Sequence, residues 1–141
     1  MGRPQYETVH DLSREQEFAT KLCERFNCEL FKLPISYNID FAATRNGEVV
    51  GWVETKVRSC SKAEFSSYIV SFSKYKSLCH YSTLSQVPAV LAIRWTDCDG
   101  IYTVGGNEKP LLKVGGRTRK TRDSADVEVV VHIPISLFKT L

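Results

Sequence analysis

The Asn46-Gly47 dipeptide constrains the fold of this chain more than any other short feature of its sequence. Asn-Gly favours the two-residue turn whose twist matches that of two antiparallel strands. The residues before it, Tyr37 to Thr44, and after it, Val49 to Val57, are rich in strand-forming side chains. The sequence therefore predicts a β-hairpin here.

Helices and further strands are predicted on both sides of this hairpin. Ser13 to Phe26 has apolar residues at helical spacing, and Ser13 with Gln16 three residues later predicts a capping box at its start. A second helix is predicted from a Ser73 cap to about Leu84. Further strands are predicted over residues 28–33, 68–72, 89–95, 101–104 and 127–133. This order predicts one α/β domain over residues 1–141, with a mixed central β-sheet flanked by helices.

Composition narrows the kinds of site and compartment. The five cysteines form no Cys-x-x-Cys pair, and the three histidines lie far apart, which argues against zinc. An odd number of cysteines without a secretory signal predicts reduced thiols. No apolar run is long enough for a membrane span. We therefore expect a cytoplasmic protein with no membrane partner.

Positive charge is concentrated in one segment of the chain. Residues 117–122 contain four basic side chains and no acidic one: Arg117, Arg119, Lys120 and Arg122. Without these 4, the 19 basic residues fall to 15, against 16 acidic ones. This distribution predicts contacts to the phosphates of a nucleic acid. A solvated loop is the alternative interpretation.

Two acids and a lysine are expected to meet on the predicted hairpin. Asp40 lies in its first strand, and Glu54 and Lys56 lie in its second. Because Glu54 and Lys56 are two residues apart, they point to the same face of their strand. The backbone carbonyl of Thr55, between them, stays near the same edge. The sequence thus predicts a site with two carboxylates and one ammonium.

This set of groups suits hydrolysis of a phosphodiester. Asp40 and Glu54 are hard oxygen ligands for Mg²⁺ or Mn²⁺, with the Thr55 carbonyl as a third ligand. A metal there would polarise the phosphate and activate a water, and Lys56 would orient that water or offset developing charge. The alternative is that Glu54 and Lys56 form an ordinary solvated strand face or ion pair.

The pattern Asp40…Glu54-Thr55-Lys56 resembles the signature of the PD-(D/E)XK nuclease superfamily. Residues 68–75, 114–117 and 131–138 resemble those of small phage-encoded members, and the core resemblance spans roughly residues 13–104. Ile39 stands where many members have proline. The resemblance implies a restriction-endonuclease-like core and, for a phage protein, the cytoplasm of the host cell.

The resemblance also implies two further site residues. Members often carry a glutamate on the first helix, with apolar residues three and seven positions later. Glu15 fits this spacing, whereas Glu17 is turned away from that face. The alternative is that both acids only favour the helix N-terminus electrostatically. Lys74 matches a lysine or glutamine that related enzymes direct at the metal from the second helix, and its alternative is a solvated lysine.

Together these features predict a metal-dependent endonuclease that hydrolyses phosphodiester bonds in DNA. A non-catalytic DNA-binding module that retains the fold is one alternative, although the complete acid–acid–lysine set argues against it. An RNA-processing nuclease would use the same chemistry. If both strands of a duplex are cut, a homodimer is the simplest arrangement for so small a chain.

Overall fold

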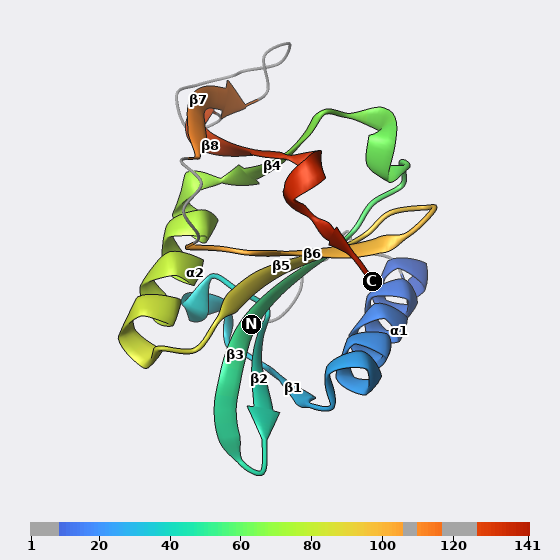
Figure 1. Ribbon diagram of the computed structural model, residues 1–141, viewed down its shortest axis with the longest axis vertical. Coiled ribbons are helices and arrows are strands. Elements are labelled where there is room, and N and C mark those ends of the chain that lie inside the picture. Colours follow the sequence, from blue (N-terminus) through green and yellow to red (C-terminus); the bar gives the residue numbers. More distant parts are fainter. Residues whose placement is uncertain (1–8, 106–109, 117–126) are drawn as a thin grey trace.

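The computed structural model describes residues 9–105, 110–116 and 127–141. Its centre is a six-stranded mixed sheet in the order β1-β2-β3-β5-β6-β9 (Figure 1). Within the described residues, β3 and β5 are the one parallel pair of this sheet, and the other neighbours run antiparallel. The strands span β1 (Glu29–Lys32), β2 (Phe41–Arg45), β3 (Glu48–Val57), β5 (Ala89–Arg94), β6 (Asp99–Thr103) and β9 (Lys139–Thr140).

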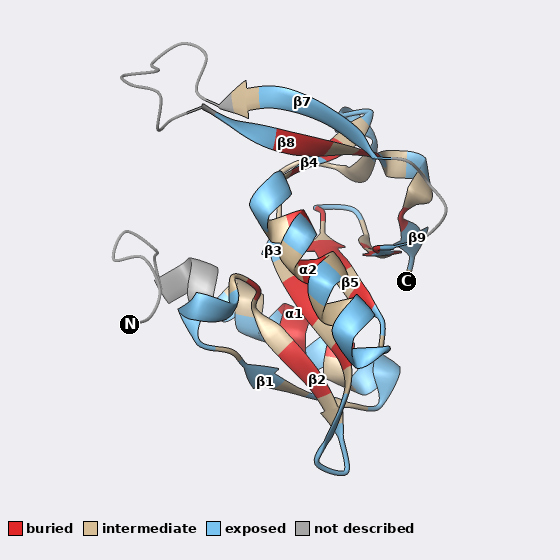
Figure 2. Ribbon diagram, turned by 90° about the vertical axis from the view of Figure 1, so that its left-hand side faces the viewer, coloured by how far each residue is buried: buried red, intermediate tan, exposed pale blue. Residues whose placement is uncertain are grey.

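One helix covers each face of the central sheet. Helix α1 (Val9–Phe26) buries Phe18 and Leu22 in an apolar cluster with Val53 and Ala92. Helix α2 (Phe72–Ser85) lies on the other face, where its buried side chains join the main core cluster. Figure 2 shows the buried parts of the strands between the two helices. Because side chains alternate along a strand, successive residues of β3 and β5 face different helices.

A second sheet of three strands packs beside the start of α2, on the same face of the central sheet. Its order is β4-β8-β7, with β4 (Ser67–Ser71), β8 (Val127–Pro134) and β7 (Leu111–Gly116). Val131 and Ile133 of β8 lie in the same apolar cluster as Leu91 and Ile93 of β5. Strands were predicted over residues 68–72 and 127–133 as part of the central sheet, but they form β4 and β8 of the second sheet. Strand β7 was not predicted.

The predicted hairpin is confirmed. Arg45 of β2 pairs with Glu48 of β3, and both turn residues, Asn46 (φ 54°) and Gly47 (φ 80°), adopt the left-handed conformation. This is the backbone that a type I′ turn needs. The first strand is shorter than predicted, since a 3-10 helix occupies Ile35–Tyr37 and Asn38 is left-handed at φ 63°.

Both helices begin earlier than their predicted caps. Helix α1 starts at Val9, so Ser13 lies inside it, because the short Ser-x-x-Gln pattern also fits the interior of a helix. Helix α2 is capped by Ser71, whose hydroxyl accepts the backbone N–H of Lys74 at 3.1 Å. Short 3-10 helices also occur at Lys62–Glu64 and Ile135–Leu137.

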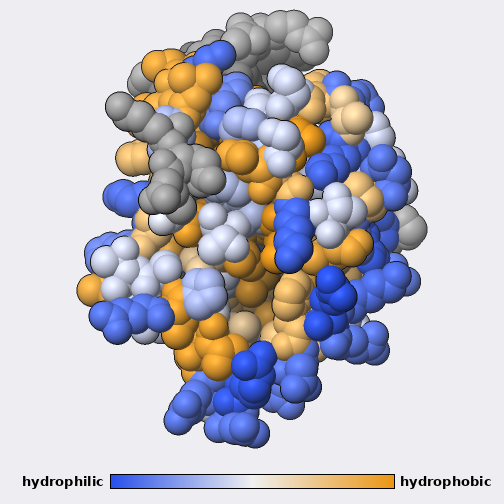
Figure 3. All heavy atoms as spheres, viewed as in Figure 1, coloured by the Kyte–Doolittle hydropathy of each residue, from blue (hydrophilic) through white to orange (hydrophobic). Residues whose placement is uncertain are grey.

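The face of the sheet that α1 covers only in part is hollowed and apolar. A cavity of about 290 Å³ lies there, lined by residues that include Leu22, Phe26, Val90 and Ile101. Figure 3 shows apolar side chains at the centre of this view, with polar ones around the edge. No helix in the described part of the chain has the length and apolar character to cross a membrane.

Candidate active site

Asp40 lies one residue before β2, at the edge of the central sheet. One of its carboxylate oxygens, Oδ2, accepts both the backbone N–H of Thr55 (3.0 Å) and the Thr55 hydroxyl (3.1 Å). These two bonds take the place that a further residue of β2 would have in the ladder. The Asp40 carboxylate is therefore held in the plane of the sheet, at the point where β3 extends past β2.

Glu54 approaches Asp40 from the α2 side of β3. Its Oε1 accepts the backbone N–H of Asp40 (3.1 Å), and its Oε2 accepts Lys74 Nζ (2.8 Å). Only 7% of Glu54 is exposed, and it is the one acidic or basic residue among those with described side chains that counts as buried. The pKa of Glu54 is raised to about 7: burial is the largest cause, the charge of Asp40 also raises it, and Lys74 lowers it. The site thus holds a carboxyl group that resists ionisation even with the Lys74 ammonium against it.

The backbone of Thr55 points toward the same edge. On the β5 side of β3, Trp52 donates its N–H to the Pro88 carbonyl and Arg58 donates to the Arg94 carbonyl. Thr55 donates its N–H to Asp40, on the opposite side of β3. Within a strand residue, N–H and C=O point the same way. The Thr55 carbonyl is therefore directed past the start of β2, beside the Asp40 carboxylate.

Lys56 shares the strand face of Glu54 but lies in the open. It is exposed, and within the described parts of the chain it makes no hydrogen bond or ion pair. The ammonium that contacts Glu54 is that of Lys74. The two lysines therefore differ in environment, because Lys74 is bound to a carboxylate and Lys56 faces solvent.

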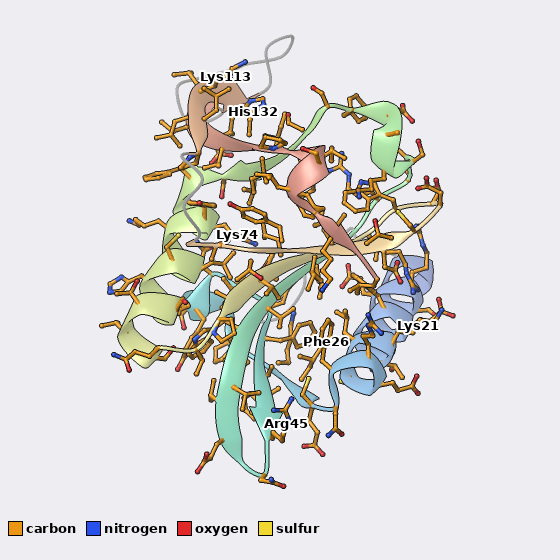
Figure 4. The ribbon with its side chains drawn as sticks, in the orientation of Figure 1. Lys21, Phe26, Arg45, Lys74, Lys113 and His132 are labelled. Atoms are coloured by element: carbon orange, nitrogen blue, oxygen red, sulfur yellow. The ribbon has the colours of Figure 1, made fainter. Side chains whose placement is uncertain are left out.

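The start of α2 fixes Lys74. Figure 4 shows the Lys74 side chain leaving α2 toward the central sheet. The Ser71 cap sets the first turn, and the amide of Asn38 donates to the hydroxyls of Ser73 (3.1 Å) and Ser77 (3.3 Å) on the same helix. Since Asn38 comes two residues before Asp40, these bonds tie the first acid to the helix that carries the lysine.

The two glutamates of α1 have different surroundings. Glu15 is half-buried on the helix face of Phe18 and Leu22, which packs against the side of the sheet opposite Glu54. Glu17 is exposed and pairs with Arg94 (3.1 Å), an arginine that also binds Asp99 through two hydrogen bonds. Glu17 therefore forms an ion pair with a structural role.

Lys32 is a site residue that the sequence did not reveal. Its ammonium lies 3.3 Å from Asp40 Oδ1 and 5.0 Å from the centre of the Phe41 ring. The register of β1 on β2, in which Lys32 pairs with Phe41, brings it there. Only the register of β1 on β2 could have indicated this contact, and the sequence of a four-residue strand does not determine its register.

The chemistry of the donors fits a hard divalent cation. Asp40, Glu54 and the Thr55 carbonyl offer oxygen ligands only, which is the preference of Mg²⁺ and Mn²⁺. Two ammonium groups, from Lys32 and Lys74, already lie against these carboxylates. In residues 9–105, 110–116 and 127–141, no three His, Cys, Asp or Glu side chains cluster as a metal site, so a backbone or water oxygen would complete the ligand set.

The basic run Arg117, Arg119, Lys120 and Arg122 lies outside the described residues. Gly116 of β7, the described residue before it, pairs with Val127 of β8.

Comparison with known proteins identifies the family. A family model described as "Phage putative PDDEXK endonuclease" matches residues 1–141. The chain therefore belongs to this family of phage PD-(D/E)XK endonucleases, and the predicted resemblance is confirmed. No curated protein matches the sequence.

A solved structure shares the fold. It is that of Hjc, a Holliday junction resolvase from the archaeal hyperthermophile Archaeoglobus fulgidus, with a TM-score of 0.54 and 14% sequence identity. The match covers 89% of this chain and 87% of that one. At this identity the likeness shows the fold alone, and it confirms the predicted restriction-endonuclease-like α/β architecture. Family and fold together make the chain a nuclease.

Proposed function

We propose that this nuclease is a metal-dependent DNA endonuclease, acting as one domain in the cytoplasm of the host cell, with Mg²⁺ or Mn²⁺ at Asp40 and Glu54. The observation that carries the proposal is the contact of the two acids at the edge of the sheet, where the backbone N–H of Asp40 binds Glu54 and both Asp40 and Thr55 face the same edge. A buried carboxyl with a raised pKa is typical of a functional site.

Each residue has a role in hydrolysis of a phosphodiester. Asp40, Glu54 and the Thr55 carbonyl hold the cation, which when bound offsets the negative charge that develops on the phosphate. The Lys56 ammonium is free to donate to a water or to a phosphate oxygen. Lys74 holds Glu54 in position through its 2.8 Å contact, and Glu15 assists from α1.

DNA contacts away from the site come from the basic run. Arg117, Arg119, Lys120 and Arg122 would bind phosphates, which gives affinity without sequence preference. A homodimer would place two sites on one duplex if both strands are cut.

Two other functions use the same fold. A DNA-binding module without activity would bind DNA but show no metal-dependent cleavage. An RNA-processing nuclease would cleave RNA under conditions in which DNA stays intact. We find no residue in the described chain that favours either over DNA hydrolysis.

A cleavage assay tests the proposal. Linear duplex, single-stranded and branched DNA, with a matched RNA, are incubated with Mg²⁺, Mn²⁺ or EDTA. We expect cleavage of DNA that EDTA abolishes and that is lost in both Asp40→Asn and Glu54→Gln. Cleavage that persists in EDTA, or in either variant, would contradict the proposed site.

A further inference from the structure

A second cavity lies beside the candidate active site, under the segment that joins β3 to β4 (residues 58–66, green in Figure 1). Its volume is about 350 Å³. The lining contains two basic side chains and no acidic one, with aromatic and hydroxyl groups between them: Arg58, Cys60, Lys62, Phe65, Ser66, Ser67, Tyr68, Ile69, Trp95 and Ile135. Cations, aromatic rings and hydroxyls without acids form a surface suited to a nucleotide.

Arg58 lies on the same strand face as the active-site residues. Its backbone N–H donates to the Arg94 carbonyl (2.7 Å), which continues the β3–β5 ladder by one residue. Side chains alternate along a strand, so Glu54, Lys56 and Arg58 form one row. Four strand residues span roughly 13 Å, and the cavity therefore begins within a nucleotide or two of the candidate metal site.

The guanidinium of Arg58 lacks an acidic partner in the described part of the chain. It is half-buried and stacks on the Tyr68 ring, 5.6 Å from the ring centre, and no hydrogen bond or ion pair to a described residue satisfies its N–H groups. Arginine has five donors in a planar fork that matches a phosphate. A half-buried arginine in this state is suited to binding an anion.

Tyr68 contacts the Arg58 guanidinium and lines the cavity. Its ring is buried, and the pKa of Tyr68 is raised to about 12: burial is the largest cause, Arg58 lowers the pKa, and Glu54 and Asp40 raise it. The charges of Arg58, Glu54 and Asp40 therefore all act on the Tyr68 hydroxyl.

The floor of the cavity is made of buried aromatic rings, and its rim is exposed. Tyr68 and Trp95 are both buried, and each packs edge-on against Phe138 (ring centres 5.9 and 5.4 Å apart). Lys62 is braced by the Phe138 carbonyl and the Thr140 hydroxyl, which leaves one of its three donors. Phe65 on the rim is 55% exposed, so its ring is open to contact from outside the cavity.

We propose that this cavity binds one unpaired nucleotide next to the cleaved phosphate, with Arg58 on its phosphate and Phe65 against its base. The inference rests on the proposed DNA endonuclease function and names its substrate class. A base inside a duplex is already paired and stacked, so an aromatic wall reaches it only when it lies outside the stack. The preferred substrate is therefore DNA with a single-stranded or branched segment at the cleavage position.

Binding measurements test the cavity without depending on cleavage. A fluorescent duplex and the same duplex with a short single-stranded flap are titrated with protein in Ca²⁺. Wild type should bind the flap DNA more tightly than the duplex. Phe65→Ala should weaken binding of the flap DNA by roughly 5- to 150-fold, the range for loss of one stacked base, and leave duplex binding unchanged.

Two matched variants control for surface changes elsewhere. Phe31→Ala removes another exposed phenyl (62% exposed) from β1, and Arg25→Gln removes an exposed arginine from α1. Arg58→Gln should weaken flap binding at least tenfold, beyond the effect of Arg25→Gln. Equal affinity of wild type for the two DNAs, or a Phe65→Ala variant that behaves like Phe31→Ala, would overturn the proposal.

The cleavage assay on the same DNAs separates the two proposals. If wild type prefers the flap DNA in binding but cleaves neither DNA with Mg²⁺ or Mn²⁺, the endonuclease function is wrong and the nucleotide cavity stands. If wild type cleaves DNA and the Phe65→Ala and Arg58→Gln variants bind and cleave like their controls, the cavity assignment is wrong and the function stands.

Discussion

Glu54 is held in an environment that opposes its charge, and replacing it with glutamine removes that charge while keeping the shape of the side chain. Burial is the largest cause of its raised pKa, and the neighbouring Asp40 adds to it. The folded chain therefore holds a proton on Glu54 more tightly than the unfolded chain does. The contribution of this group to stability is fully present below pH 4.5 and is lost as the pH rises through about 7.

The magnitude follows from the two pKa values. A rise from 4.5 to about 7 lowers the free energy of unfolding by roughly 3 kcal/mol once both states are ionised, at 1.36 kcal/mol per pKa unit. Roughly 2 to 3 kcal/mol of this loss falls between pH 5 and pH 8. Glutamine does not titrate, so Glu54→Gln should gain that amount relative to wild type over the same pH range.

The assay is urea unfolding of both proteins at pH 5, 6, 7 and 8, with EDTA present to remove divalent cations. Titrating groups that do not interact with Glu54 behave alike in the two proteins and cancel in the difference. Glu48→Gln, at the exposed end of the same hairpin, is the matched control and should show no such trend. If the difference between Glu54→Gln and wild type is the same at pH 5 and pH 8, the reasoning about the buried carboxyl is wrong.

Four further predictions concern activity, stability and DNA binding. Lys56→Ala should abolish cleavage and leave thermal unfolding and DNA affinity near wild type, because its proposed work is done in the transition state; an equal loss of binding and turnover would make it a phosphate anchor. Lys74→Ala should lower the free energy of unfolding at pH 8 by about 1–3 kcal/mol, because it leaves the buried Glu54 without its ammonium partner. Lys76→Ala, on the exposed side of α2, should have little effect in the same unfolding experiment. Glu15→Gln should lower turnover with little change in melting temperature, and wild-type turnover would leave this glutamate with an electrostatic role at the helix start alone. Alanine at all four basic positions of residues 117–122 should make the dependence of log affinity on log salt shallower by about one unit per lost phosphate contact. The measurement is a salt titration of duplex DNA binding in Ca²⁺, and an unchanged slope would indicate a solvated loop.

Local features of the fold could be predicted, and partners distant in sequence could not. The hairpin was predictable because an Asn-Gly turn determines its own backbone. The second sheet was not, since β4 pairs with β8 some sixty residues later along the chain, and nothing local marks which strand a short apolar segment will join. Strand β7 was missed because Leu111–Gly116 ends in two glycines, which weaken a strand pattern.

The same distinction holds at the candidate site. Asp40, Glu54 and Lys56 could be placed from the hairpin alone, because spacing along two paired strands determines their faces. That Lys74 rather than Lys56 contacts Glu54 depends on how α2 docks, and the contact of Lys32 with Asp40 depends on the register of β1. The docking of α2 and the register of β1 depend on packing throughout the core. The sequence of one segment is therefore not enough to predict these two contacts.

The hairpin also has a consequence for the order in which the molecule assembles. Asp40 and Glu54 are 14 residues apart and are joined by a turn that forms on its own, whereas β3 meets its parallel partner β5 only after the chain has passed through β4 and α2. Hairpins form within microseconds, but pairings of distant segments must first overcome the entropy of closing a long loop. During folding, the two negative charges are thus brought together before Lys74 arrives to offset them. A proton on either acid, or a cation from solution, would offset this charge until Lys74 docks.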